Sequence, residues 1–114
     1  MGTYTRGRPR RADPVDAGRA REVLQAALES WKRGEPPEAL RKRSPPITVQ
    51  DMDWEAGSRL VDFRVVGAGQ SEDANLRCPV RLTLRDPQGR ATEKSVTYLV
   101  GTSPVPTVFR ELFH

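Results

Sequence analysis

Residues 13–34 constrain the fold most, because their pattern is that of a single amphipathic helix. Asp13 can accept a backbone N–H as an N-cap, and Pro14 suits the first helical position, where no N–H is needed. Apolar side chains then recur every three or four residues and line one face: Ala20, Val23, Leu24, Ala27, Leu28 and Trp31. Gly34 can adopt the left-handed conformation that ends a helix. The sequence therefore predicts a helix over residues 14–33 with one apolar stripe.

After the helix, the apolar period changes to two, which indicates strands. The expected strands are residues 47–54, 60–66, 76–85, 90–100 and 105–113. In the clearest of them, alternate residues are apolar: Leu76, Cys78, Val80, Leu82 and Leu84. A proline lacks the N–H of a ladder, so Pro79 indicates a bulge or an edge position, and Pro106 favours an edge for the last strand.

The same alternation assigns the two faces of the other strands. The inner residues of the second strand are predicted to be Val61, Phe63 and Val65. Leu60, Val66 and Leu99 then fall on the outward alternation. Exposed apolar residues on a sheet favour contact with another chain, so we expect a homodimer that packs through the sheet.

The composition fits a small domain with a thin core. Only 36% of the 114 residues are hydrophobic, which is enough for one helix stripe against one sheet face. We expect a single α+β domain over residues 13–114, with one long N-terminal helix packed on a curled antiparallel sheet of four or five strands. The sequence has no run of about 18 apolar residues and no apolar signal core. We therefore expect a soluble chain, cytoplasmic unless a precursor segment has been removed.

The net charge of +4 comes from the N-terminus. The first eleven residues contain no acid and four arginines: Arg6, Arg8, Arg10 and Arg11. The rest of the chain has 15 basic and 15 acidic residues, so the body is neutral. Residues 1–12 offer little to bury and are expected to form a disordered basic tail.

Within that tail, Arg6-Gly7-Arg8-Pro9 resembles the core of the AT-hook, a peptide that lies in the minor groove of A·T-rich DNA. A narrow groove with a high negative potential attracts extended arginines. The resemblance implies nucleic-acid binding by the tail, and a solvated tail is the alternative interpretation.

Most enzyme chemistries lack their residues in this sequence. The only histidine is His114, the last residue, which argues against Ser-His-Asp and Cys-His catalysis and against most zinc sites. Cys78 lies on the apolar face of the best strand, which predicts a buried, unreactive thiol. No pattern indicates a cofactor.

Three acids, Asp51, Asp53 and Glu55, are the one candidate for a metal site. If this stretch is a strand, their carboxylates share a face and could coordinate a hard cation. Met52 and Trp54 would then face the core, and the alternative is three solvated acids beside a packed tryptophan.

The order of elements, one long helix and then a curled antiparallel sheet, is similar to the cystatin-like and nuclear-transport-factor-2-like folds over residues 14–113. The chain also resembles a group of small bacterial domains to which we can assign no function. The shared motifs are Trp31-Lys32-x-Gly34-x-Pro36-Pro37-Glu38-x-Leu40, Ser44-Pro45-Pro46-Ile47, Asp51-x-Asp53-Trp54, Cys78-Pro79-Val80-x-Leu82-Thr83-Leu84-Arg85-Asp86 and Tyr98-x-Val100-Gly101-Thr102. These resemblances imply a cone-shaped fold and no particular activity.

Enzymes of the cone fold place an Asp or a Tyr between helix and sheet, and the candidates here are Asp62 and Tyr98. Asp62 is predicted to face away from the core, and the phenol of Tyr98 has no acid or base partner nearby in sequence. We therefore expect a non-catalytic binding or association domain, with Trp31, Phe63 and Tyr98 as walls of any pocket. Nucleic-acid binding through the tail and a small-molecule enzyme are the alternatives.

Overall fold

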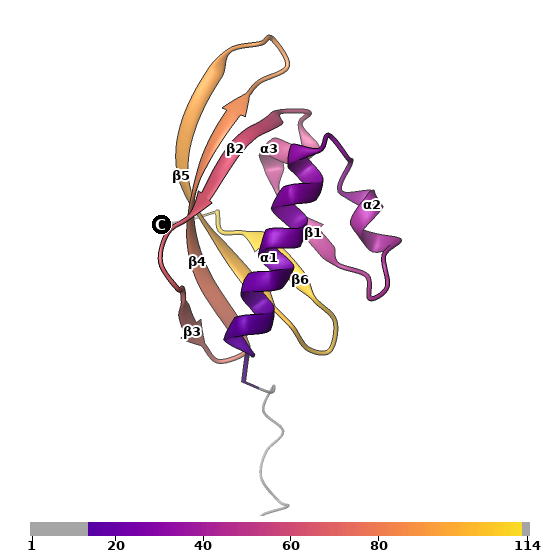
Figure 1. Ribbon diagram of the computed structural model, residues 1–114, viewed down its shortest axis with the longest axis vertical. Coiled ribbons are helices and arrows are strands. Elements are labelled where there is room, and N and C mark those ends of the chain that lie inside the picture. Colours follow the sequence, from indigo (N-terminus) through magenta and orange to yellow (C-terminus); the bar gives the residue numbers. More distant parts are fainter. Residues whose placement is uncertain (1–13, 113–114) are drawn as a thin grey trace, which may run out of the picture.

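A computed structural model of the chain describes residues 14–112 and combines one long helix with a curled sheet (Figure 1). The elements in chain order are α1 (Ala17–Lys32), α2 (Glu38–Arg41), β1 (Thr48–Gln50), α3 (Met52–Glu55), β2 (Arg59–Val65), β3 (Gln70–Glu72), β4 (Asn75–Arg85), β5 (Ala91–Gly101) and β6 (Thr107–Arg110). The prediction of an α+β chain with one long N-terminal helix is confirmed. The sheet has six strands, one or two more than expected.

Helix α1 begins three residues later than predicted. Its N-cap is Asp16, whose carboxylate accepts the backbone N–H of Arg19 at 3.0 Å. Val15 instead donates its N–H to the carbonyl of Asp73 at 3.1 Å, which keeps the residues before Asp16 out of the helix. Pro14 therefore precedes the helix, and residue 13, the predicted cap, lies outside the described residues.

The predicted end of α1 and its apolar stripe are confirmed. Gly34 has a φ of 90°, and its N–H reaches the carbonyl of Trp31 at 2.8 Å, which closes the helix. The whole stripe is buried: Ala20, Val23, Leu24, Ala27, Leu28 and Trp31. It packs against the inner face of the sheet, where β4 contributes its alternate residues: Leu76, Cys78, Val80, Leu82 and Leu84.

The sheet is mixed, so the prediction of a purely antiparallel sheet is wrong. Its strands lie in the order β1-β6-β5-β4-β2, and β3 also pairs with β4. Strands β2 to β6 pair antiparallel, but β1 runs parallel to β6. Consequently β6 lies between β1 and β5 and is not an edge strand. Pro106 immediately precedes β6, where its carbonyl accepts the N–H of Thr48 at 3.1 Å.

Strand β2 contains an irregularity that reverses the expected faces at its start. The register with β4 shifts between Leu60 and Asp62, so Val61 is an extra residue, as in a β-bulge. Leu60 consequently points into the core and is 3% exposed, whereas Val61 is 44% exposed. The predicted faces of Leu60 and Val61 are therefore wrong. Phe63 and Val65 regain the inner face and pack against the core.

Strand β4 lies in the middle of the sheet, so an edge position for Pro79 is wrong. Val66 donates its N–H to the carbonyl of Pro79 at 2.8 Å, and the ladder with β2 ends there. In an antiparallel sheet, the C=O and the N–H of a residue point to the same neighbouring strand. The carbonyl of Pro79 points toward β2, so the N–H that a proline lacks would also have pointed toward β2. Pro79 therefore lies next to the point where β2 ends and residues 67–69 begin, so the ladder between β2 and β4 does not need its N–H.

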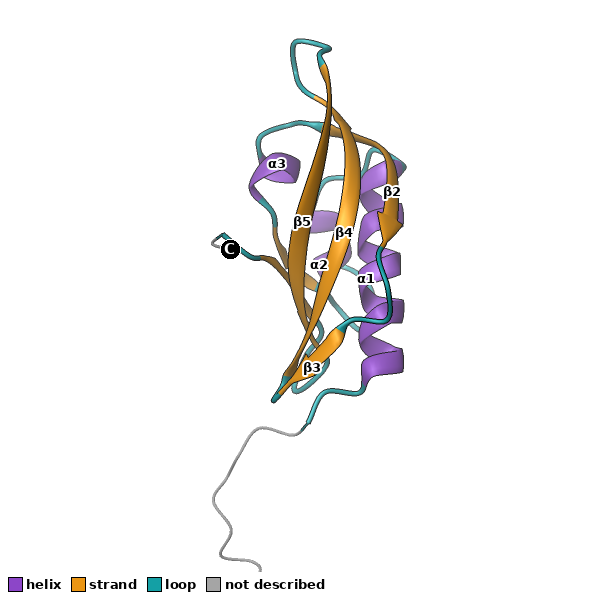
Figure 2. Ribbon diagram, turned by 90° about the vertical axis from the view of Figure 1, so that its left-hand side faces the viewer, coloured by secondary structure: helices purple, strands orange, loops and turns teal. Residues whose placement is uncertain are grey.

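The helices and the sheet form two layers. Figure 2 views β4 and β5 from the side opposite α1 and α2, and no described element lies in front of these strands. The inner face of the sheet is therefore covered, and its outer face is bare over the described residues.

Candidate functional site

The polar cluster that the fold brings together starts at Asp51, the N-cap of α3. The predicted strand over residues 47–54 ends at Gln50, because the carboxylate of Asp51 accepts the backbone N–H groups of Asp53 and Trp54 at 2.9 and 3.2 Å. Glu55 reaches back to the N–H of Asp51 at 3.3 Å. This turn directs the Asp51 side chain inward, where the residue is 2% exposed.

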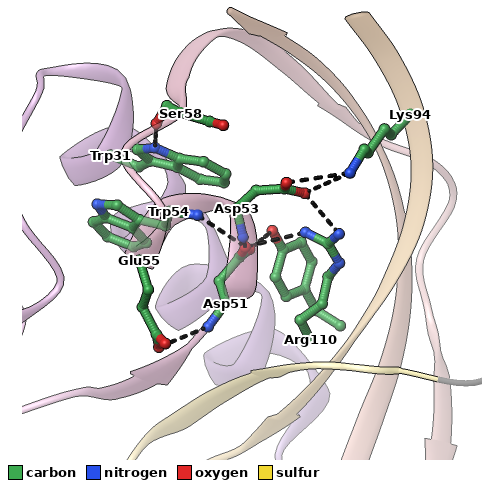
Figure 3. A network of polar contacts seen from close by, with 9 residues as sticks. Trp31, Asp51, Asp53, Trp54, Glu55, Ser58, Lys94 and Arg110 are labelled. Atoms are coloured by element: carbon green, nitrogen blue, oxygen red, sulfur yellow. Dashed lines mark hydrogen bonds and ion pairs between the residues drawn. The ribbon is translucent and has the colours of Figure 1, made fainter. Parts of the chain in front are cut away.

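The sheet supplies two partners for this carboxylate. Tyr98 on β5 and Arg110 on β6 are direct cross-strand neighbours, and both point to the inner face. The Tyr98 hydroxyl donates to Asp51 Oδ2, and Arg110 Nη1 donates to Asp51 Oδ1 at 3.0 Å (Figure 3). Tyr98, whose hydroxyl had no evident partner in the sequence, therefore forms a hydrogen bond with the carboxylate of Asp51.

A second carboxylate balances the charges. Arg110 Nη2 donates to Asp53 at 2.8 Å, and Lys94 Nζ approaches the same carboxylate at 2.9 Å (Figure 3). We refer to Asp51, Asp53, Lys94, Tyr98 and Arg110 as the Asp51 cluster. It contains two acids and two cations, and its centre is closed, since the side chains of Asp51 and Arg110 are only 1% and 7% exposed.

These contacts shift the titration of the cluster. Burial and the nearby charge of Asp51 raise the pKa of Tyr98 well above its usual value, so the phenol stays protonated. Burial also acts to raise the pKa of Asp53, but hydrogen bonds from Lys94 and Arg110 outweigh it and leave that pKa below its ordinary value. Burial acts to lower the pKa of Arg110, and the hydrogen bond to Asp53 overcomes it.

The side chains of the Asp51 cluster form hydrogen bonds with one another and so connect separate elements of the fold. Every buried side-chain nitrogen and oxygen within residues 14–112 has a hydrogen-bond partner. A general base needs an oxygen that faces a substrate, and Asp51 already accepts from Tyr98, Arg110 and the backbone. The cluster therefore fastens α3 to β5 and β6.

Beside the cluster, two tryptophans join the end of α1 to α3. The rings of Trp31 and Trp54 stack with centroids 5.2 Å apart and an interplanar angle of 6°. Trp31 donates its indole N–H to the carbonyl of Ser58 at 2.8 Å, and Trp54 donates to that of Glu35 at 2.9 Å. Both rings are almost fully buried, so most of this contact is core.

Trp31 and Trp54 are among the residues that line a groove of about 410 Å³. Residues 34–38 and 57–59 form its sides, and Glu38, Glu55 and Arg59 bring charge to it. We refer to it as the tryptophan groove. Neither Glu38 nor Glu55 forms an ion pair within the described part of the chain, although the Glu55 carboxylate accepts the N–H of Asp51. The groove therefore offers one exposed carboxylate without a described partner, that of Glu38.

The three predicted pocket residues do not share a cavity. Trp31 lines the tryptophan groove, Phe63 lines a separate hollow of about 280 Å³, and Tyr98 lies in the Asp51 cluster. Asp62 faces outward, as predicted, and lies 3.5 Å from Lys32 Nζ.

The proposed metal ligands are arranged differently from the prediction. Asp51, Asp53 and Glu55 belong to a helical turn and not to a strand, so they do not present three carboxylates on one face. Among residues 14–112 there is no group of three or more His, Cys, Asp or Glu side chains that could hold a metal ion. Cys78 is buried, and burial raises the pKa of its thiol, which makes the thiolate rare.

The outer face of β4 carries the arginines that alternate with the core residues. Arg81 lies 3.7 Å from Glu93 on β5, and Arg77 lies 3.5 Å from Glu72, so this face carries charges of both signs. The tail arginines Arg6, Arg8, Arg10 and Arg11 lie outside the described residues. In the described portion, no helix has the length and apolarity to cross a membrane.

Lys94 and Arg110 are the residues of the cluster that sequence reasoning missed. Arg110 lies two residues after the buried Val108, so strand alternation places it on the inner face. That signal was present in the sequence, but it identifies a partner only once Tyr98 and Arg110 are known to be neighbours.

Comparisons with protein-family models, with curated proteins and with solved structures find no match.

Proposed function

We propose that this chain is a non-catalytic association domain that pairs with a second copy through the outer face of its sheet. The observation that carries the proposal is the division between a closed inner side and a bare outer side. Helix α1 fills the inner face with apolar side chains, and the Asp51 cluster satisfies its own charges. Of the two faces of the sheet, the outer one is therefore the face that is open to a partner.

An apolar area on the outer face supports this choice. Leu99 and Phe109 are direct neighbours on β5 and β6, and both are half-buried on the outward alternation. Val66 is 46% exposed, and its neighbour Pro79 is also exposed. We refer to these four residues as the outer apolar patch. Leu60, expected to be part of it, belongs to the core.

A polar contact borders the patch. Arg77 on β4 and Glu111 after β6 form a bidentate ion pair at 2.6 and 2.9 Å, which spans β5. The pair holds the end of the chain on the sheet next to Leu99, the cross-strand neighbour of Arg77. Apolar residues with a polar rim are the usual anatomy of a protein interface.

Sedimentation equilibrium of the full chain tests the proposal. We expect a mass that rises toward twice the chain mass at high micromolar concentration, and a monomer for Leu99→Glu because a carboxylate cannot be buried unpaired. Ala91→Glu is the matched control, since Ala91 is exposed on the same face of β5 about 26 Å away. A monomeric wild-type chain at these concentrations would rule out self-association.

A second candidate is ligand binding in the tryptophan groove. The exposed carboxylate of Glu38, with that of Glu55 nearby, suits a cationic group. Binding should change tryptophan fluorescence on titration with a short lysine- or arginine-containing peptide, and Glu38→Gln should weaken it. An unchanged emission spectrum at millimolar peptide would remove this candidate.

Nucleic-acid binding through the tail remains a lower-ranked proposal, because the body of the chain is neutral. It predicts binding to A·T-rich DNA that weakens steeply with salt and is abolished by deletion of residues 1–12. Retained binding after the deletion would exclude the tail. The likeness to the cone folds is likewise a proposal, supported by the long helix against a curled sheet.

A further inference from the structure

Three polar residues form a row across the outer face of the sheet. Arg64 on β2 is the direct cross-strand neighbour of Arg81 on β4, and Arg81 is in turn the neighbour of Ser95 on β5. All three are exposed. We refer to Arg64, Arg81 and Ser95 as the arginine row. It brings two guanidinium groups and a hydroxyl together from strands that are distant in sequence.

The row is unfavourable as it stands. Like charges directly opposite each other destabilise a sheet. Arg64 has no ion pair within residues 14–112, and Arg81 has only the 3.7 Å contact with Glu93, in which both side chains are largely exposed. The Ser95 hydroxyl has no hydrogen-bond partner in the same range. The row therefore offers donors that no described residue uses.

A hollow lies over the row. Its volume is about 480 Å³, and its lining includes Arg64, Arg81 and Ser95 with Val66, Gly67 and Pro79. This volume is sufficient for a small molecule. The hydrogen-bond donors of the arginine row therefore line a hollow that is large enough for a ligand.

A second pair of arginines on the outer face, Arg59 and Arg85, differs from Arg64 and Arg81 in its contacts. Arg59 and Arg85 are also direct neighbours across β2 and β4. Arg85, however, donates from Nη1 to the carbonyl of Gly89 at 2.8 Å, and Arg59 lines the tryptophan groove instead. This second pair therefore serves as an internal control.

We propose that the arginine row binds a small tetrahedral oxyanion, such as the phosphate group of a phosphomonoester. Two planar guanidinium groups can each donate two hydrogen bonds to such an anion, and the Ser95 hydroxyl supplies another. The anion also removes the repulsion between Arg64 and Arg81. The proposal concerns each chain alone and does not rest on self-association.

The neighbouring row explains why the ligand is small. Asp62 and Glu93 flank Thr83 one step further along the same face, so acids lie beside the arginines. A continuous polyanion such as a nucleic-acid strand would meet this acidic row, whereas a single phosphate group fits over the arginine row alone. The observations thus favour a free phosphate group over a phosphate in a nucleic-acid backbone.

Titration of the isotope-labelled full chain with inorganic phosphate, followed by NMR, tests the proposal. We expect saturable shifts at the backbone amides of Arg64, Arg81 and Ser95. In Arg81→Ala the affinity should fall by about tenfold, and Arg85→Ala should bind as the wild type does. Both substitutions lie at exposed positions, so the fold should persist, and the spectra report it directly.

Two results would overturn the proposal: no saturable shift at these amides up to tens of millimolar phosphate, or equal weakening by Arg81→Ala and Arg85→Ala. A parallel titration with a single-stranded oligonucleotide distinguishes the source, because binding there that depends on Arg81 and exceeds phosphate binding would assign the row to nucleic acid. The same titration on Leu99→Glu should still give saturable phosphate binding, because Arg64, Arg81 and Ser95 are all present in that variant. Sedimentation reports self-association separately, so the two proposals can fail independently.

Discussion

Arginines on the two faces of one sheet are in opposite situations. Arg110 points inward, where its side chain is 7% exposed and contacts the carboxylates of Asp51 and Asp53 at 3.0 and 2.8 Å. Arg81 points outward, where its side chain is 59% exposed and has one contact, at 3.7 Å. The inner arginine had to be paired to be buried at all. Arg64 and Arg81 on the outer face carry no such requirement, and their guanidinium groups donate no hydrogen bond within residues 14–112.

This difference separates stability from binding in the molecule. The inner face holds every charge in a closed arrangement, so substitutions there should change the free energy of unfolding. The outer face contributes little to that free energy, so substitutions there should change what the chain binds. The predictions below test this separation.

The largest effect is expected for Arg110→Met. The variant leaves two carboxylates without their main cation, and loss of one partner of a buried pair costs about 3–5 kcal/mol. Urea unfolding measures the change. Arg81→Met, the same substitution on the outer face, should change the free energy of unfolding by less than about 0.5 kcal/mol. Equal losses in the two variants would refute the separation of faces.

Tyr98→Phe should have the next largest effect. It removes one hydroxyl donor from the buried Asp51 and should cost about 1–3 kcal/mol at neutral pH. Because the pKa of Tyr98 is raised in the folded state, only the unfolded chain ionises near pH 10. The stability that this hydroxyl contributes is therefore present below pH 10 and is lost as the pH rises further.

Unfolding measured at pH 7 and pH 10.5 checks both parts. The difference between wild type and Tyr98→Phe should shrink at the higher pH. A constant difference would mean that the phenol does not titrate differently in the two states.

A smaller effect is expected in acid. The pKa of Asp53 is lowered in the folded state, so its stabilising contribution is present at neutral pH and is lost as the pH falls below about 4. Asp53→Asn should be less stable than the wild type at pH 7, and the difference between the two should shrink as the pH falls below about 4. Chemical unfolding at neutral and acid pH measures this, and Asp62→Asn is the exposed control, which should change the free energy of unfolding at pH 7 by less than about 0.5 kcal/mol.

The smallest effect is expected for Arg64→Gln. Removal of one of two opposed arginines should raise the free energy of unfolding by about 0.2–0.5 kcal/mol in phosphate-free buffer. Added phosphate should stabilise the wild type more than this variant, because ligand binding to the folded state adds to stability and the variant has lost one of the two guanidinium groups. A melting-temperature series in phosphate measures both effects, and a variant that phosphate stabilises as much as the wild type would place the anion elsewhere.

The regular parts of the fold could be predicted from the sequence because their signals are local. The apolar stripe that ends at Trp31 and the alternation through Cys78 each repeat over many residues, and both are buried as expected. Gly34 also ends α1 as its type suggests. Such patterns survive a shift of a few residues at their ends, as the start of α1 at Ala17, three residues later than predicted, illustrates.

The irregular parts depend on single residues or on distant partners. The extra residue Val61 places Leu60 on the inner face and Val61 itself on the outer face. The pattern of apolar residues in β2 does not predict this bulge. At Asp51, an acid before a short helical turn resembles an alternating strand, and Glu55 lies four residues later, one more than the spacing of a capping box. The parallel pairing of β1 with β6 joins segments almost sixty residues apart, which no local pattern encodes.

The candidate sites were predictable to different degrees for the same reason. Trp31 and Tyr98 were recognised as inward residues, but their contacts with Trp54, Asp51 and Arg110 depend on how α3 meets β5 and β6. The arginine row likewise needs the register that sets Arg64 opposite Arg81.

Backbone amide NMR spectra of the full chain at two protein concentrations test the central claim most directly. If the outer face is the association surface, concentration should shift the amides of Thr97, Leu99 and Phe109 and leave those of Asp51, Trp54 and Tyr98 unchanged. Shifts centred on the inner residues or on the tryptophan groove would contradict the account, as would identical spectra up to millimolar concentration.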